Sequence, residues 1–163
     1  MLHRKEYIEG GATGENVSVT DTQHALLDSS DCGFRIRGWG QNKEEAIQNA
    51  ALGMFSYHID DMEKVAIRDK YVFGISGAVT LNCLLLKFYN TLLSASTIND
   101  YFIPRQVIIK SFDETNFSIE AVAYGEKLDP ARHSLGKEFK GVTNEFEFRE
   151  EGNVVSVIIR GIC

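Results

Sequence analysis

The chain has 163 residues, enough for one domain that buries about two thirds of its unfolded surface. Its composition, 44% hydrophobic and 25% charged, is that of an ordinary globular protein. The formal net charge of −6 argues against a general nucleic-acid binder, because attraction to phosphate supplies most non-specific affinity. We therefore expect any contact with RNA to be indirect, through a partner protein.

The sequence shows no sign of secretion or membrane insertion. Residues 1–15 are polar and lack the apolar core of a signal peptide. The longest apolar segment, 78–93, is interrupted by polar side chains and predicts a buried helix rather than a membrane span. The three cysteines, Cys32, Cys83 and Cys163, form no CxxC pair, and their odd number argues against a disulfide framework. We expect a cytoplasmic or nuclear protein with no membrane contact, and we interpret Cys163 as inert rather than reactive.

Residues 1–20 are predicted to be a weakly ordered segment, because they contain three glycines and few large apolar side chains. Residues 21–163 are expected to form the single domain. Its first strand is predicted at 34–37, where apolar and charged residues alternate as on a strand with one solvated face. A turn is predicted at 38–40, where glycines flank Trp39.

Two helices are predicted next. Asn42 and Glu45 form a capping box, in which the asparagine oxygen accepts a first-turn N–H and the glutamate reaches back. Apolar residues then keep helical spacing over 46–57. In the second helix, 81–93, the apolar surface wraps so far round that the helix must pack against a sheet and another element.

The rest of the chain is strand-like. Extended segments are predicted at 65–76, 107–112, 117–124, 138–143, 145–149 and 154–159. Polar residues at 113–116 and 150–153 suit tight turns between antiparallel neighbours. Because strands and helices do not alternate regularly, the predicted fold class is α+β rather than parallel α/β, with both helices packed on one face of a largely antiparallel sheet.

Familiar catalytic and nucleotide-binding motifs are missing from the sequence, including a Walker loop, GxGxxG, HExxH and GxSxG. One candidate site is the pair Asp28 and Asp31, which precedes the first strand. Two carboxylates three residues apart suit a hard cation such as Ca²⁺ or Mg²⁺, whose preferred ligands are oxygens. The alternative, favoured by the pattern alone, is a polar turn in which these side chains bond to the local backbone.

A second candidate is the segment 133–143, which joins His133, a turn glycine and Lys140 into a cationic patch. Such a patch suits phosphate or an acidic surface of a partner. The alternative is a solvated loop that leads into an exposed strand. The aromatic run 101–105 is interpreted as a buried corner rather than a binding platform, because its proline suits the start of a strand.

Together these segments resemble the archease family. The matching residues are Trp39-Gly40, Glu44-Glu45-Ala46, Asn49-Ala50-Ala51-Leu52-Gly53-Met54-Phe55, Tyr101-Phe102-Ile103-Pro104-Arg105, Asn116-Phe117, Tyr124-Gly125-Glu126, and the His-x-x-Gly-x-x-x-Lys-x-x-Thr run from His133 to Thr143. They occur in the family's order over residues 26–160. The resemblance implies a compact, archease-like α+β domain.

The resemblance also implies a function. Archease family members are known not as enzymes but as protein cofactors of the RtcB-type RNA-splicing ligase, which joins tRNA exon halves with GTP and Mn²⁺. The expected role is to promote guanylylation of the ligase and its multiple turnover in tRNA splicing. One alternative is an adaptor or chaperone-like interaction protein of the same fold that has lost the metal-dependent role. Another is an independent hydrolase that uses Asp28, Asp31 or His133.

The sequence departs from the family pattern at the metal site, which in this family often holds Ca²⁺ between acidic groups. The family's Asp-His-Thr-Ala-Asp is here Asp28-Ser29-Ser30-Asp31, with Asp31 placed on the metal-binding aspartate. The family's second aspartate is replaced by Arg160. Losing an anionic ligand and adding a positive charge weakens the binding of any divalent cation. We predict that Arg160 pairs with Asp31, and also with Asp28, in place of the cation. The alternative is an Arg160 that is exposed to solvent.

Overall fold

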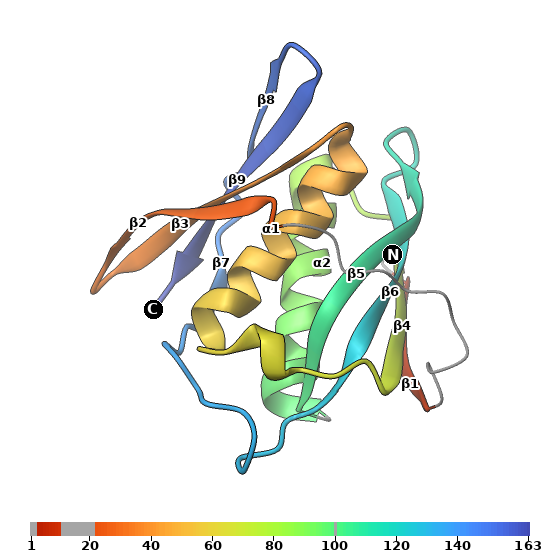
Figure 1. The fold of residues 1–163 in the computed structure, drawn as a ribbon. Coiled ribbons are helices and arrows are strands. Elements are labelled where there is room, and N and C mark those ends of the chain that lie inside the picture. Colours follow the sequence, from red (N-terminus) through yellow and green to blue (C-terminus); the bar gives the residue numbers. More distant parts are fainter. Residues whose placement is uncertain (1–2, 11–21, 100) are drawn as a thin grey trace.

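The computed structural model describes residues 3–10, 22–99 and 101–163 (Figure 1). Its strands are β1 (His3–Gly10), β2 (His24–Ser30), β3 (Gly33–Gly40), β4 (Asp69–Ser76), β5 (Phe102–Asp113), β6 (Ser118–Lys127), β7 (Gly141–Val142), β8 (Glu147–Glu151) and β9 (Val154–Ile162). Its helices are α1 (Lys43–His58) and α2 (Leu81–Ser94), with short helical turns η2 (Met62–Lys64) and η3 (Ala95–Asn99). No helix of these residues is long and apolar enough to cross a membrane.

The strands form two antiparallel sheets with the helices between them (Figure 1). The first sheet has the order β1-β4-β6-β5, and the second has the order β2-β3-β9-β7, with β8 also paired to β9. Helix α1 contacts β3 and β9 of the second sheet and β5 of the first, whereas α2 contacts β4, β6 and β7. The predicted α+β class is confirmed. The predicted single sheet is instead divided in two, so that each helix is covered on both sides.

Helix α1 begins as its sequence predicts. The Asn42 side chain accepts a hydrogen bond of 2.9 Å from the Glu45 N–H, and Glu45 Oε2 accepts one of 2.6 Å from the Gln41 N–H. These contacts satisfy backbone donors that have no partner within the helix. The hydrophobic side chains of α1 and α2 that are fully buried between the sheets are Ala46, Ile47, Ala50, Ala51, Met54, Phe55, Leu84, Leu85, Phe88 and Tyr89.

One segment near the start of the chain differs from the sequence-based expectation. Residues 3–10, within the segment expected to be weakly ordered, form β1 and pair with β4 along its whole length. The pairing satisfies the backbone groups at that edge of β4, and Ile8 adds a side chain packed against the core. The remainder of the expected segment, residues 1–2 and 11–20, lies outside the described residues.

The predicted turn at 38–40 is part of strand β3, and Gly38 has a packing role. A Cβ atom on Gly38 would lie 2.2 Å from the Ala50 backbone nitrogen and 2.6 Å from the Ala46 carbonyl oxygen of α1. Only a residue without a side chain therefore lets α1 lie this close to β3. The expected strand at 138–143 is also shorter than predicted, because only Gly141 and Val142 pair with β9.

We predict that Gly38→Ala lowers the free energy of unfolding by about 1–3 kcal/mol, because the added methyl group meets backbone atoms that cannot rotate away. Urea denaturation of the purified protein measures this loss. The matched control is Gly74→Ala in β4, where the nearest atoms to the added methyl group are 3.5 Å away. Equal losses for the two variants would contradict the packing role of Gly38.

Candidate functional site

Asp28, the first candidate ligand, is held by an arginine of the neighbouring strand. In the β2–β3 pair Asp28 lies opposite Arg35, after a bulge between Leu26 and Asp28. Arg35 donates two hydrogen bonds to Asp28 Oδ2, from Nη2 at 2.5 Å and from Nε at 2.8 Å. The Arg35 hydrogen bond, assisted by the charge of Arg160, holds the pKa of Asp28 below its usual value. Asp28 is therefore an ionised carboxylate that already has a cationic partner.

Asp31 lies in the turn between β2 and β3 and is exposed. Its side chain makes no hydrogen bond or ion pair with the described part of the chain. The turn itself is supported by Ser30, whose Oγ accepts a 3.2 Å hydrogen bond from the Cys32 N–H. Asp31 is thus a solitary surface carboxylate beyond the end of the paired strands.

Arg160 does not pair with Asp31, contrary to our prediction. The register of β3 and β9 places Arg160 opposite Arg35, within the sheet, whereas Asp31 lies in the turn past the strand end. Arg160 Nε instead lies 3.4 Å from Glu145 Oε2. Across the described residues, no group of three or more His, Cys, Asp or Glu side chains is arranged to hold a metal ion. Because Asp28 is occupied by Arg35 and a second arginine lies nearby, these donors do not fit a divalent cation.

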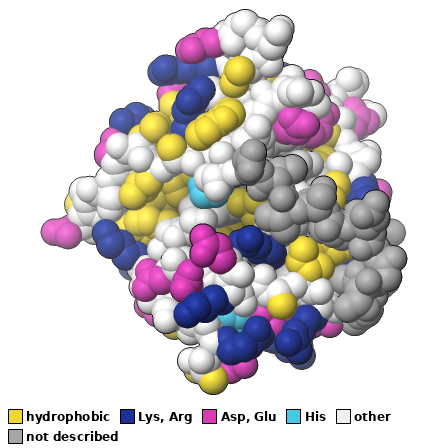
Figure 2. Space-filling model, in the orientation of Figure 1, with side chains coloured by type: hydrophobic (Ala, Val, Ile, Leu, Met, Phe, Trp, Pro, Cys, Tyr) yellow, Lys and Arg dark blue, Asp and Glu magenta, His cyan; other side chains and the backbone are white. Residues whose placement is uncertain are grey.

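Four arginines lie on the face of the second sheet that points away from the helices. Burial alternates along β3, so that Arg35 and Arg37 point outward while Phe34 and Ile36 face α1. Arg160 of β9 and Arg149 of β8 complete the set, which we call the arginine face. Figure 2 shows dark blue and magenta side chains side by side over this part of the molecule, at the upper left.

Arg37 differs from the other three arginines of this face. Arg35 pairs with Asp28, Arg160 pairs with Glu145, and the Nη2 atom of Arg149 lies 2.8 Å from Glu147 Oε1. Arg37 has no carboxylate partner among the residues that the structure describes, and its guanidinium lies 5.1 Å from the centre of the Trp39 ring. Such a cation–π contact leaves the charge uncompensated.

Two shallow depressions flank Arg160 on this face. One, of about 340 Å³, is lined by Asp28, Arg35, Cys32 and Arg160 among others. The second, of about 320 Å³, is lined by Glu145, Glu147 and Arg160 together with residues of the loop before β8. The ion pairs around them are partly solvent-exposed, and such pairs contribute little to stability. Breaking these ion pairs therefore costs little stability, and each arginine can pair with another carboxylate instead.

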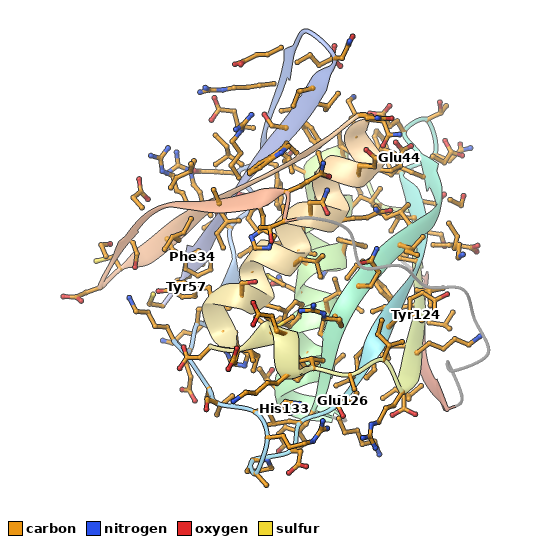
Figure 3. All side chains as sticks on the ribbon, in the orientation of Figure 1. Phe34, Glu44, Tyr57, Tyr124, Glu126 and His133 are labelled. Carbon is orange, nitrogen blue, oxygen red and sulfur yellow. The ribbon has the colours of Figure 1, made fainter. Side chains whose placement is uncertain are left out.

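The second candidate residue, His133, is buried instead of exposed. Its Nδ1 atom accepts a 2.8 Å hydrogen bond from the Asp129 N–H, so the ring proton is on Nε2, which lies 3.1 Å from Glu126 Oε2. Figure 3 shows His133 and Glu126 next to each other at the end of β6. Of the two residues predicted to bind a partner, Lys140 is exposed, whereas His133 is buried and holds the loop that follows β6.

Glu126 is the centre of this buried cluster, and sequence reasoning did not identify it as such. It accepts a 2.5 Å hydrogen bond from the Ala66 N–H and also pairs with Arg132, and Arg68 Nε lies 3.5 Å from it. Burial alone would raise the pKa of Glu126, but the hydrogen bonds from Ala66, Arg132 and His133 outweigh burial and lower it. The carboxylate thus joins β6 to the segment before β4 and to the following loop.

We predict that Glu126→Gln lowers the free energy of unfolding at pH 7 by about 1–3 kcal/mol, because two arginines lose a buried anionic partner. The folded-state pKa of Glu126 is lowered, so its contribution is present above its unfolded pKa and is lost as the pH falls through the folded value. Urea denaturation at pH 7 and at successively lower pH should show the difference between variant and parent shrinking in acid. Glu120→Gln, at an exposed position of the same strand, is the control; a pH-independent difference would contradict the prediction.

We also predict that the unmodified protein binds Ca²⁺, Mg²⁺ and Mn²⁺ weakly, because Arg35 and Arg160 repel a cation from Asp28. Isothermal titration calorimetry measures the affinity. Arg160→Asp replaces the repelling charge by a carboxylate and should strengthen Ca²⁺ binding by tenfold or more. Tight binding to the unmodified chain that Asp31→Ala abolishes would show the prediction wrong.

The comparisons with known proteins agree with this architecture. The sequence pattern of the Archease protein family (MTH1598/TM1083) matches residues 26–159. Over 129 residues the chain is 28% identical to a protein from Drosophila melanogaster named "Protein archease-like", a match that covers 79% of this chain and 81% of that protein. Over 110 residues it is 32% identical to "Protein archease" of Pyrococcus abyssi, and this match covers 66% of this chain and 75% of that protein.

The fold also resembles a solved structure. The solution structure of protein 1598 of Methanobacterium thermoautotrophicum superimposes with a TM-score of 0.67 and 21% sequence identity. The superposition covers 87% of this chain and 99% of that one. At this level of identity the comparison shows that the two proteins share a fold.

Proposed function

The chain belongs to the archease family, and on that premise we propose that it activates an RNA-splicing ligase of the RtcB type. In this role it promotes guanylylation of the ligase and its multiple turnover in tRNA splicing, and it performs no ligation itself. The observation that carries the proposal is the match to the family over residues 26–159, nearly the whole domain. Family membership supports the general role of tRNA-splicing ligase activator. The RtcB type of the ligase and the acceleration of its guanylylation are part of our proposal.

The geometry of the candidate residues supports a protein cofactor rather than a hydrolase. Asp28 is bound to Arg35, and Asp31 is exposed and makes no hydrogen bond or ion pair with the described residues. His133 is buried, and both of its ring nitrogens are engaged within the loop. General acid–base or nucleophilic catalysis needs two such groups within hydrogen-bond reach of one substrate atom, and these three side chains provide no such pair.

We propose the arginine face as the surface that contacts the ligase, with Lys140 at its margin. Four arginines face solvent from one sheet of a protein whose net charge is −6, and Arg37 has no compensating carboxylate among the described residues. Lys140 is exposed, and its backbone N–H donates a 2.7 Å hydrogen bond to the Ile162 oxygen at the end of β9. These features suit carboxylates on the ligase surface, while RNA is reached only through the ligase, in the cytoplasm or the nucleus.

A second function is favoured by one observation. The resemblance to the family implies a metal-binding aspartate at the position of Arg160, and Arg160 pairs with Glu145. A member that has lost a carboxylate at this position has lost part of the family's metal chemistry, which suits an adaptor or chaperone-like protein of the same fold. Affinity capture from the source cells distinguishes the two functions. Capture of a ligase complex supports the ligase activator, and capture of unrelated client proteins supports the adaptor.

The decisive experiment measures guanylylation and multiple-turnover ligation by the cognate ligase, with and without this protein. We predict faster guanylylation and repeated turnover in its presence, and no ligation by this protein alone. Arg37→Ala should reduce the stimulation several-fold, because the uncompensated charge at the centre of the face is lost. Lys110→Ala removes the same charge from an exposed position of β5, in the other sheet, and should leave the stimulation unchanged.

Two outcomes would decide against the proposal in different ways. If unmodified protein leaves guanylylation and turnover unchanged, the proposed activator function is wrong. If it stimulates the ligase but Arg37→Ala and Lys110→Ala behave alike, the function stands and the arginine face is not the contact surface.

A further inference from the structure

Two of the three cysteines lie at the same end of the second sheet. The last described pair of the β3–β9 ladder is Gly33 opposite Ile162. Cys32 is the last residue of the β2–β3 turn and directly precedes Gly33, and Cys163 directly follows Ile162, so both cysteines are chain neighbours of this pair. Both are free thiols in the structure.

Contacts of both residues with Ser30 confirm that they are close in space. The Cys32 N–H donates a 3.2 Å hydrogen bond to Ser30 Oγ, and Cys163 Sγ lies 4.0 Å from the Ser30 carbonyl oxygen. A disulfide needs Cα atoms separated by about 4.4–6.8 Å. The shared contacts with Ser30 bring the two residues into the neighbourhood that such a bond requires.

Cys163 lies on the inner side of the second sheet. Because side chains alternate along a strand, Cys163 shares the face of Gly161, whereas Cys32 lies in the turn between β2 and β3. Phe34 and Gly161 are opposed in the ladder, and the ring centroids of Phe34 and Tyr57 lie 4.1 Å apart. Figure 3 shows these two residues next to each other. Cys163 Sγ lies 4.0 Å from the Tyr57 hydroxyl, which places it on this same side.

The strands approach each other closely here, and one thiol is open to solvent. A Cβ atom on Gly33 would lie 2.4 Å from the Gly161 carbonyl oxygen, so little space separates β3 from β9 beside the cysteines. Cys32 is exposed and Cys163 is half-buried. An exposed thiol reacts first, and a half-buried thiol beside it is held in position to complete the exchange.

We propose that Cys32 and Cys163 form a reversible disulfide that fastens the end of β9 to the β2–β3 turn. The oxidant is a small-molecule disulfide such as oxidised glutathione. The Cys32 thiolate attacks one of its sulfurs, forming a mixed disulfide and releasing one small thiol. The Cys163 thiolate then displaces the second small thiol, so two protein thiols are oxidised while one small disulfide is reduced to two thiols.

The bond would have a local consequence. Cys32 and Ile162 line the same depression as Asp28, Arg35 and Arg160. Fastening the strand ends would restrict this margin of the arginine face, whereas reduction would release it. The chemistry itself does not depend on the ligase, so it stands whether or not the proposed function is right.

The test equilibrates the purified full chain with mixtures of reduced and oxidised glutathione, followed by rapid alkylation and peptide mass spectrometry. We expect a peptide cross-linked between Cys32 and Cys163 that dithiothreitol removes. Oxidation should raise the thermal unfolding midpoint by about 10 °C, because the bond closes a long loop of the unfolded chain. Cys83→Ser should behave like the parent, whereas Cys32→Ser and Cys163→Ser should each lose both the cross-link and the shift.

Peptide mapping of the unmodified protein keeps the test decisive even if a cysteine variant fails to fold. A disulfide between two molecules, a bond that involves Cys83, or stable glutathione adducts without a cross-link would each overturn the proposal. So would two thiols that remain fully reduced at every glutathione ratio.

Discussion

The burial of α1 between two sheets is the constraint from which the rest of the molecule follows. Because α1 covers the inner face of the second sheet, alternate residues of β3 must point to the core, and the residues between them must point to solvent. Gly38 lets the helix backbone approach the strand directly. The arginines at positions 35 and 37 are therefore outward-facing as a consequence of the packing beneath them.

The electrostatics of the outer face follow from the same register. Once β2, β3 and β9 are aligned, Arg35 lies between Asp28 on one side and Arg160 on the other. Arg35 forms an ion pair with Asp28, and Arg160 forms one with Glu145, which precedes β8. A pocket of carboxylates for a divalent cation is incompatible with this order of charges, whereas a surface of exchangeable ion pairs is compatible with it.

Features set by neighbours in the chain were predictable from the sequence. The capping contacts of Asn42 and Glu45 join residues three or four positions apart, and Asp113 accepts hydrogen bonds from the N–H groups of Thr115 and Asn116 in the predicted turn. Hydrophobic spacing located both helices for the same reason. The resemblance of dispersed short segments to the archease family then identified the fold, because their order along the chain is informative even where each segment is weak.

Features set by register or by long loops were not predictable. The division of the strands into two sheets depends on which strands pair, which a local pattern does not encode. The Arg160–Glu145 pair depends on the strand register, which a one-residue slip would change. His133 looked like a surface residue because its sequence neighbours are polar, yet the loop folds back and buries it against Glu126. Gly38 was predicted to lie in a turn. A glycine that is needed for close packing against a helix cannot be told apart, in the sequence alone, from a glycine that is needed in a turn.

The bulge in β2 has a consequence for how this molecule avoids self-association. Strand β2 ends the second sheet, pairs within the described residues only with β3, and carries Leu26 and Leu27 exposed to solvent. A long, flat strand of this kind would be a template for fibril growth. The irregularity between Leu26 and Asp28 interrupts the straight row of backbone donors and acceptors, and the charge of Asp28 follows at once. The bulge and Asp28 therefore disfavour edge-to-edge aggregation through β2.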